Sequence, residues 1–509
     1  MAGSVSLFFF SLMALASYLD GQTLGGPMHG KAVVCYVASW AAYRTGHGAF
    51  TIGDLEPSLC THLVYAFAGL DEATGGIKSL DAWQDLPNDY GKDGYNRMVG
   101  LKTRYPHLKV TIAIGGWNEG SEKYSKMAAD PGRRAKFIRS VMTFLGTYKF
   151  DGLDLDWEYP TKRGGLAEDK NNFALLVKEL KAAFQERGYI LTAALGASPA
   201  TMGAAYDLVK LGPHFDLIHM MCYDYHGTWD RMVGANAPLR SSADDLSVVS
   251  EHTIKYMIAQ GVSPYKLVLG LPMYGRTFVL QDPEVRDIEF GRTPAKEQGF
   301  QGPFTKENGF MGYNEICAET TNTSARWTHH WHAQSGTPYL RDGARVVSYD
   351  NGRSIAMKVK MAVDYGLGGL MVWSIDTDDF RGDCANETDP YADFVRRYGE
   401  MADDPRMGKA LPALNLPESN HRTLAKRSFY SVQNGRLHLR LPQPETSNYN
   451  LMRTINEAAT LALEEKKILD ELERVTRMNE IDDGGKPGAG CGLASSVAVI
   501  VFCALSGML

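Results

Sequence analysis

Apolar runs of strand length alternate with helical stretches along most of the chain. Apolar residues at three-and-four spacing in Arg133–Leu145 and Asn172–Gln185 are typical of amphipathic helices. The apolar runs are almost continuous in Val, Ile, Leu and Ala, so we expect strands that helices bury on both faces. They number eight: Ala32–Ala38, Leu63–Ala68, Val110–Gly115, Leu153–Trp157, Ile190–Leu195, Leu217–Tyr223, Leu267–Leu271 and Leu370–Ile375. This repeat predicts an α/β fold, a (β/α)8 TIM barrel over residues 28–400.

The regular spacing is interrupted once. About a hundred residues separate the seventh and eighth predicted strands, which is far more than a crossover needs. We therefore expect an α+β insertion subdomain over about residues 276–348. Beyond the barrel, Pro-, Asn- and Arg-rich sequence predicts an irregular linker over 401–450. Residues 451–480 are charged and helical, and they fit either a weakly self-associating stalk or a solvated spacer helix.

The two ends of the chain are the most apolar segments. Val5–Ala16 is followed by small residues, which predicts a secretory signal peptide over residues 1–21; a buried first helix is the alternative. Residues 482–509 place a small, polar spacer before the apolar run Leu493–Leu509, as in a glycosylphosphatidylinositol (GPI) attachment signal. A retained tail anchor is the alternative, although no Lys or Arg follows the run. We expect an extracellular protein that contacts the membrane through this end.

Composition narrows the functional classes. The chain has 509 residues, of which 44% are hydrophobic and 22% charged, which excludes a wholly disordered or multi-span membrane protein. A net charge of −6 supplies no general basic field, so we expect no nucleic-acid partner. If Cys491 and Cys503 belong to the tail, five of the seven cysteines remain, enough for two disulfides and a buried Cys222 thiol. The sequons at Asn322 and Asn386 fit a glycosylated surface.

Three acids stand at alternate positions near the end of the fourth predicted strand. Asp154, Asp156 and Glu158 project to one side of this strand, and Trp157 projects to the other, where we expect core packing. Acids crowded on a buried face repel one another and lose solvation, so at least one pKa must rise. A carboxylic acid that titrates near neutral pH can donate a proton in catalysis. Tyr159 stands where a calcium-binding EF-hand loop needs Gly, and no His is nearby, so we expect no metal.

The same segment carries a family resemblance. Asp151–Glu158 reads D-G-x-D-x-D-W-E and resembles the signature of glycoside hydrolase family 18, the chitinases. The likeness extends from about Lys31 to Tyr398 and includes motifs after other strands. These motifs lie at the carboxyl ends of predicted strands, where barrel enzymes place their sites: Gly115-Gly116-Trp117, Met221 to Asp224, Tyr274 to Arg276, and Gly368 to Trp373.

The resemblance implies a retaining mechanism in which the substrate supplies the nucleophile. Glu158 would protonate the glycosidic oxygen and then activate water. Asp156 would orient the acetamido N–H of the sugar, with Asp154 sharing a proton behind it. Tyr223 would donate a hydrogen bond to the acetamido oxygen, and no cofactor is implied.

The resemblance also implies a groove for a polymer of N-acetylglucosamine, with Trp373 beneath the cleaved sugar. Aromatic rings suit the apolar C–H faces of sugars. The expected substrate-binding residues are Tyr36, Trp40, Phe67, Gly116, Trp117, Met221, Asp224, Trp229, Tyr274, Arg276 and Trp373. The family's disulfide positions match Cys35 with Cys60 and Cys317 with Cys384.

The predicted function is hydrolysis of the β-1,4 linkages of chitin or chito-oligosaccharides, with endo cleavage favoured. A chitin-binding lectin without turnover is one alternative, which the retained acids disfavour. An endo-β-N-acetylglucosaminidase acting on N-glycans is another. No cysteine-rich chitin-binding module fits beyond Asp404, because only Cys491 and Cys503 remain there.

Overall fold

The computed structural model describes residues 24–241, 248–322, 324, 326–384, 390–419, 428–443 and 448–482. The predicted signal peptide, the Asn386 sequon and the attachment signal after residue 482 lie outside these residues. Within them, no helix combines the length and apolar character needed to cross a membrane.

Eight parallel strands form a closed barrel, as predicted. Parallel pairing of β1 with both β2 and β14 closes it. Its strands are β1 (Ala32–Ala38), β2 (His62–Leu70), β4 (Lys109–Gly115), β5 (Gly152–Asp156), β6 (Ile190–Gly196), β7 (Leu217–Met221), β8 (Leu267–Pro272) and β14 (Gly369–Trp373). The short β3 (Ile77–Ser79) adds antiparallel to β2. The register pairs Gly115 of β4 with Asp156 of β5, which brings the glycine motif beside the acids.

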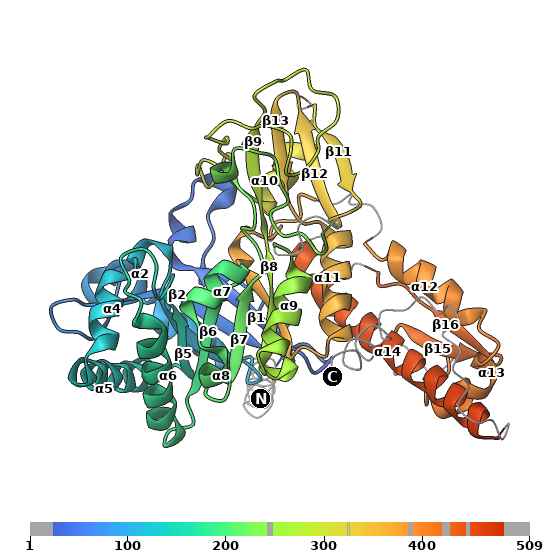
Figure 1. Cartoon of the computed structure of the whole chain (residues 1–509), viewed down its shortest axis with the longest axis horizontal. Coiled ribbons are helices and arrows are strands. Elements are labelled where there is room, and N and C mark those ends of the chain that lie inside the picture. The colour runs from blue at the N-terminus through green and yellow to red at the C-terminus, as the bar shows by residue number, and fades with distance from the viewer. Residues whose placement is uncertain are drawn as a thin grey trace, which may run out of the picture.

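Helices surround the barrel (Figure 1). In α5, the Asp130 side chain accepts the backbone N–H of Arg133, and Pro131 occupies the first turn, so the sequence itself fixes where the helix begins. Its Phe137, Val141 and Leu145 are buried. Outside the insertion, the α-helices before the eighth barrel strand are α2 (Ala82–Asp85), α3 (Gly94–Gly100), α4 (Glu122–Ala129), α5 (Pro131–Tyr148), α6 (Asp169–Gln185), α7 (Pro199–Ala205), α8 (Leu208–Leu211), α9 (Ser250–Ala259) and α11 (Gly352–Asp364).

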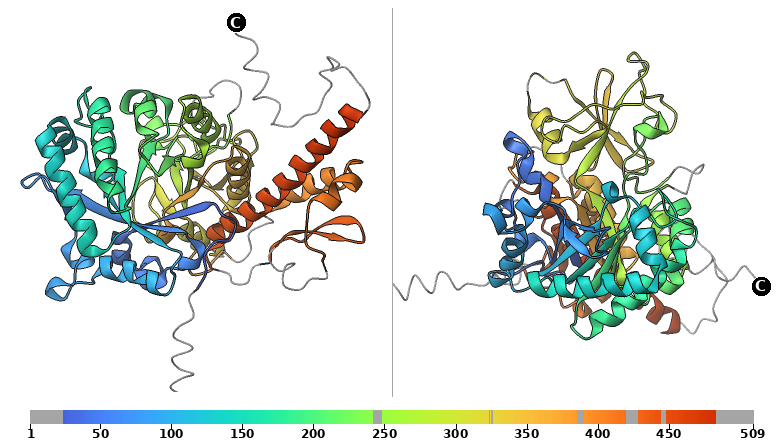
Figure 2. Two further views of the ribbon diagram at one scale, coloured as in Figure 1. Left: turned by 90° about the horizontal axis from the view of Figure 1, so that it is seen from below. Right: turned by 90° about the vertical axis from the view of Figure 1, so that its left-hand side faces the viewer.

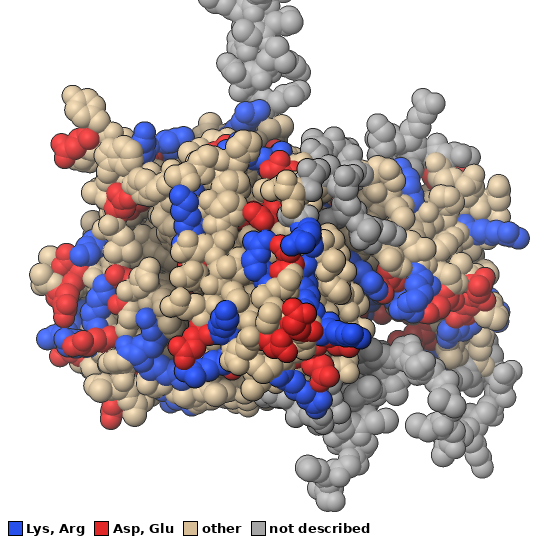
Figure 3. All heavy atoms as spheres, turned by 90° about the horizontal axis from the view of Figure 1, so that it is seen from above, with Lys and Arg blue, Asp and Glu red and all other residues tan. Residues whose placement is uncertain are grey.

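The predicted insertion is a separate layer between the seventh and eighth barrel strands, at the top of Figure 1. Five antiparallel strands pair in the order β10-β9-β13-β12-β11, and α10 (Tyr313–Thr321) accompanies them. They are β9 (Tyr274–Val279), β10 (Phe310–Gly312), β11 (Thr328–His332), β12 (Thr337–Asp342) and β13 (Arg345–Ser348). In Figure 3, Lys and Arg side chains are interspersed with Asp and Glu over the visible face.

The region after the barrel differs from the expected linker and stalk. Residues 392–482 form what we call the C-terminal module: α12 (Ala392–Ala402), α13 (Met407–Ala410), the hairpin strands β15 (Tyr430–Gln433) and β16 (Arg436–Leu439), and α14 (Asn450–Asp482). The first part of α14 packs on α11 and buries Leu451, Ile455, Ala458 and Ala462, which share one side of the helix. Figure 2 shows α14 running from the barrel out along the module. The first part of α14 is therefore a packed helix, because α11 of the barrel covers its apolar side.

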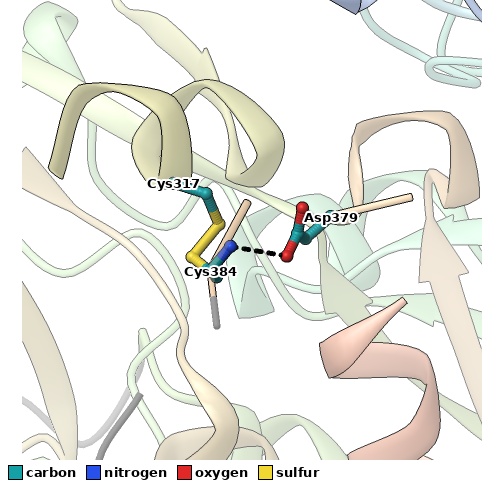
Figure 4. Close-up of side chains that lie close together, drawn as sticks. All are labelled: Cys317, Asp379 and Cys384. Atoms are coloured by element: carbon teal, nitrogen blue, oxygen red, sulfur yellow. Dashed lines mark hydrogen bonds between the residues drawn. A yellow bond between two sulfur atoms is a disulfide. The ribbon is translucent and has the colours of Figure 1, made fainter. Parts of the chain in front are cut away.

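Both expected disulfides form, Cys35 with Cys60 and Cys317 with Cys384, and Cys222 is a buried free thiol. Asp379 lies beside the second disulfide (Figure 4), but this trio is not a metal site. The sulfur atoms are bonded to each other, and the Asp379 carboxylate accepts the backbone N–H groups of residues 382, 383 and 384. The group stabilises the loop that follows β14.

Candidate active site

The three acids stand at the carboxyl end of β5. Asp154 and Asp156 are buried, whereas Glu158 lies just beyond the strand and is partly exposed. Asp154 accepts hydrogen bonds from the hydroxyls of Tyr36 at 2.6 Å and Thr192 at 2.5 Å. Both of its oxygens thus accept a hydrogen bond from a neighbouring hydroxyl, which fixes the orientation of this carboxyl behind Asp156.

The electrostatics of the next two acids favour protonation. Burial raises the pKa of Asp156 well above its ordinary value, and the carboxyls of Glu158 and Asp154 raise it further. Its Oδ1 is buried without a protein hydrogen-bond partner. Burial also raises the pKa of Glu158 to about 7, with Asp224 adding to the rise and a hydrogen bond with Tyr159 opposing it. Glu158 can therefore carry a proton near neutral pH.

Three aromatic rings form a floor beside the acids. Each ring contacts the other two: the Phe67 centroid lies 5.9 Å from that of Trp40 and 5.6 Å from that of Trp373, and the two Trp centroids are 6.2 Å apart. Trp40 is 44% exposed, so the floor is open to a ligand. Gly116 approaches from β4 with φ of +84°, and a Cβ there would lie 2.7 Å from the Phe67 ring. We call Trp40, Phe67 and Trp373 the aromatic floor.

Tyr36, predicted from the sequence to bind substrate, lies at the bottom of the site. It is only 1% exposed and packs edge-on beneath Trp373. Its hydroxyl contacts both the Asp154 carboxylate and Nδ1 of His219, the latter at 2.8 Å. A strand-end aromatic can point either way, and here it supports the acids from below.

Asp224 stands on the opposite wall, after β7. Its Oδ1 accepts hydrogen bonds from the Tyr274 hydroxyl and Nε of Arg276, both at 2.7 Å. Tyr274 is 2% exposed, and its hydroxyl helps to hold Asp224 in place. Trp229 is exposed nearby, with the Arg276 guanidinium 5.2 Å from its ring. This wall combines the carboxylate of Asp224, the guanidinium of Arg276 and the exposed ring of Trp229.

Tyr223 belongs to the same electrostatic site as the acids. Burial raises the pKa of its hydroxyl, and the charges of Asp156, Asp224 and Glu158 contribute, so the phenol stays protonated. The hydroxyl lies 3.9 Å from Sδ of Met371, a weak contact that leaves it available as a donor. Met221, at the end of β7, is partly exposed. Trp157 is buried behind the strand, as expected, and donates to Ser121.

Sequence reasoning missed Arg163. Its guanidinium lies 3.6 Å from the ring centroid of Trp117 and donates to the backbone oxygens of Trp117 and Glu158. It therefore ties an exposed aromatic platform to the acid. A lone Arg in a Gly-rich loop carries no motif that would have singled it out.

A second missed feature is the exposed pair Tyr43 and Trp83, from the loops after the first two barrel strands. Their rings stack with centroids 6.2 Å apart. Aromatic residues in the loops at this end of the barrel were the available signal, since the same signal identified Trp40 and Trp117.

The barrel and its site can be compared with those of known families. Residues 32–378 match the model of the family described as glycosyl hydrolases family 18. The chain belongs to this family. The match spans the whole barrel, including the acids, the aromatic floor and the insertion, and it ends before the C-terminal module.

Individual relatives agree. The chain is 45% identical over 482 residues to probable chitinase 2 of Drosophila melanogaster, covering 92% of this chain and 89% of the relative. The solved structure of the Ostrinia furnacalis group IV chitinase with allosamidin is 39% identical, covers 73% of this chain and 99% of that one, and has a TM-score of 0.67. Human YKL-39, described as a pseudo-chitinase that retains chitooligosaccharide binding, is 31% identical over 72% of this chain and 99% of its own, with a TM-score of 0.64.

Proposed function

We propose that this family 18 chitinase cleaves chito-oligosaccharides with retention, using Glu158 as the proton donor and the substrate's N-acetyl group as the nucleophile. The observation that carries the proposal is the placement of Glu158. Its carboxyl lies at the barrel mouth, holds a pKa of about 7, and follows the buried Asp156. A carboxyl that is protonated near neutral pH matches the demand of glycosidic oxygen protonation.

In the first step, the acetamido carbonyl oxygen attacks the anomeric carbon while the Glu158 proton moves to the leaving oxygen. The C–O bond to the leaving sugar breaks, and an oxazolinium ion forms. Asp156 accepts a hydrogen bond from the acetamido N–H, and the positive charge that develops on the sugar favours the ionised form of this carboxyl, which in turn stabilises the cation. Tyr223 donates a hydrogen bond to the acetamido oxygen and orients it.

In the second step, the Glu158 carboxylate takes a proton from water, and the resulting hydroxide attacks the same carbon. The acetamido group returns to its original form, and two inversions give net retention. Glu158 ends the cycle protonated. One carboxyl thus acts as acid and base, which explains why its pKa must lie near the working pH.

Exposed aromatic side chains outside the aromatic floor support cleavage within a chain. Trp117 and Trp229 are exposed in addition to Trp40 of the floor. Each ring offers a face for one sugar. A product profile on defined N-acetylglucosamine oligomers tests this endo mode: internal cleavage gives mixed products early, whereas exo cleavage releases one product from an end.

Two alternatives are distinguishable by experiment. Human YKL-39 is a pseudo-chitinase that retains chitooligosaccharide binding, whereas in this chain Glu158 is present with a raised pKa and Tyr36 donates to Asp154 behind it. Parallel incubation with colloidal chitin and a high-mannose glycoprotein separates chitinase from N-glycan cleavage. Release of soluble N-acetylglucosamine oligomers supports the chitinase assignment, and release of N-glycans alone refutes it.

The predicted GPI signal motivates a proposed location at the outer cell surface. Its support is the apolar C-terminal run behind a small-residue spacer. Treatment of intact cells with a phosphatidylinositol-specific phospholipase should release the enzyme. Release only by detergent contradicts a lipid anchor and favours a retained tail.

A further inference from the structure

The start of α14 is built into the loop that follows Trp373, residues 374–384. Asp378 in this loop is fully buried. Its carboxylate accepts the backbone N–H groups of Leu451 at 3.3 Å and Met452 at 3.0 Å, in the first turn of α14. These N–H groups have no partner within the helix, so a carboxylate here satisfies them.

Neighbouring contacts join the same two segments. The backbone N–H of Tyr449 donates to the carbonyl of Asp379 at 2.6 Å. The Asn450 side chain donates to the Asp379 carboxylate and to the carbonyl of Cys384, at 3.2 and 3.1 Å. Side-chain and backbone bonds therefore fix both sides of the junction.

The same loop holds the aromatic floor. Asp376 accepts the backbone N–H of Ala38 at 2.9 Å and pairs with Arg44 at 2.8 Å. These two residues bracket the short 3-10 helix η1 (Ser39–Tyr43), which presents Trp40. Trp373 immediately precedes the loop. Two of the three rings of the floor thus depend on residues 374–379 for their backbone position.

We propose that Asp378 is a positioning residue for sugar binding. Through it, the C-terminal module fixes the positions of Trp40 and Trp373 relative to each other. The inference rests on the proposed function of the groove and adds a role for a segment beyond the family match. Asp378 touches no reacting atom; it acts through the loop and Asp376.

The physical argument is the cost of an unsatisfied buried carboxylate. Without the α14 N–H groups, the Asp378 carboxylate would keep, among the described residues, only the hydrogen bond from the backbone N–H of Asp379, at 2.7 Å. A buried carboxylate short of donors is unfavourable, so the loop must shift toward water. Burial already raises the pKa of this carboxyl to about 7, which shows how little solvent it has. A displacement of the loop moves the rings that it anchors.

Replacing Asp378 by Asn in the full chain tests the proposal. Asn keeps the shape but presents an NH2 group to one of the N–H donors. Glu464→Gln is the matched control. Glu464 lies on the same helix, α14, and its carboxylate accepts the backbone N–H groups of Phe429 and Tyr430, so these contacts stay within the C-terminal module. Asn450→Ala is a milder second variant of the junction, should the first fail to fold.

The readouts are the dissociation constant for an N-acetylglucosamine hexamer, from quenching of Trp fluorescence with Glu158→Gln added to each protein so that the hexamer is not cleaved, and KM, kcat and Tm with Glu158 intact. We expect the junction variants to weaken binding and raise KM about fivefold, as when one aromatic contact loosens, with kcat little changed. Glu464→Gln should lower Tm without changing either constant. Unchanged binding in the folded junction variants, or equal weakening in the control, overturns the proposal. Failure of the unsubstituted enzyme to turn over chitin refutes the mechanism instead, because binding is measured independently.

Discussion

Replacing Glu158 by Gln should abolish turnover and, above pH 7, make the folded protein more stable. Gln has nearly the same volume but holds no transferable proton. Burial raises the pKa of Glu158, with Asp224 contributing, so the ionised form is less favourable in the folded chain than in the unfolded one. The catalytic group therefore destabilises the fold at the pH where it is charged.

The pKa values set the size of the effect. A rise from 4.5 to about 7 corresponds to about 3 kcal/mol of folding free energy. Because the folded state binds this proton more tightly, the stability of the unsubstituted protein falls as pH rises from 4.5 through 7. The gain in the Gln variant is therefore absent at low pH and largest above pH 7. Its upper limit is about 3 kcal/mol, because the substitution also alters the hydrogen bond with Tyr159.

Two measurements check this prediction. Turnover of N-acetylglucosamine oligomers should fall by about 10²- to 10⁴-fold, while calorimetry shows that oligomer binding persists. Thermal unfolding at pH 5 and pH 8 should show a higher Tm for the variant only at pH 8. Glu72→Gln, an exposed carboxyl outside the groove, serves as the control and should change neither property. Comparable turnover in Glu158→Gln, or an equal loss of Tm at both pH values, would refute the reasoning.

Further predictions follow from other contacts. The activity of the unsubstituted enzyme should fall as pH rises through about 7, because Glu158 then loses its proton, and a pH profile of kcat/KM measures this. Arg163→Gln should move that fall to higher pH, since the guanidinium lowers the pKa of Glu158; an unmoved profile contradicts the coupling. Trp373→Ala should weaken oligomer binding by about tenfold in calorimetry, and unchanged affinity would exclude it from the floor. Lys358→Met should cost about 3–5 kcal/mol in unfolding experiments by stranding the buried Asp350, and the added Asp350→Asn change should restore much of it.

The barrel was predictable because each of its strands is a distinct apolar run. The ends of those runs were less certain: the fourth was predicted as Leu153–Trp157, whereas β5 is Gly152–Asp156. Hydrophobicity reports burial, and Trp157 is buried, but it lies outside the hydrogen-bonded ladder. A period of two therefore identified the correct faces without marking where pairing stops.

The chemistry of the site was also readable, since the three acids and their alternation stand in one short segment. The orientation of aromatic residues was not. Tyr36 and Tyr274 were predicted only as substrate-binding residues, and the structure shows in addition that their hydroxyls donate to Asp154 and Asp224. Arg163 was invisible because its partner Trp117 is far away in the sequence.

The C-terminal module was misjudged for a different reason. The helix over 451–480 was expected, but an amphipathic pattern does not name the surface that covers it. Only the structure shows that α11 is that surface. The apolar positions Leu451 and Ile455 at the start of the helix are fully buried and belong to the side that packs on the barrel.

The packing of α14 on α11 has a practical consequence for anyone who shortens this enzyme. The family match ends at residue 378, but the folded unit continues to the end of the described helix. A protein truncated at that boundary would expose to water the apolar surface of α11 that α14 covers. Solubility and heat tolerance would suffer first, even though every group that handles the substrate's reacting atoms would still be present.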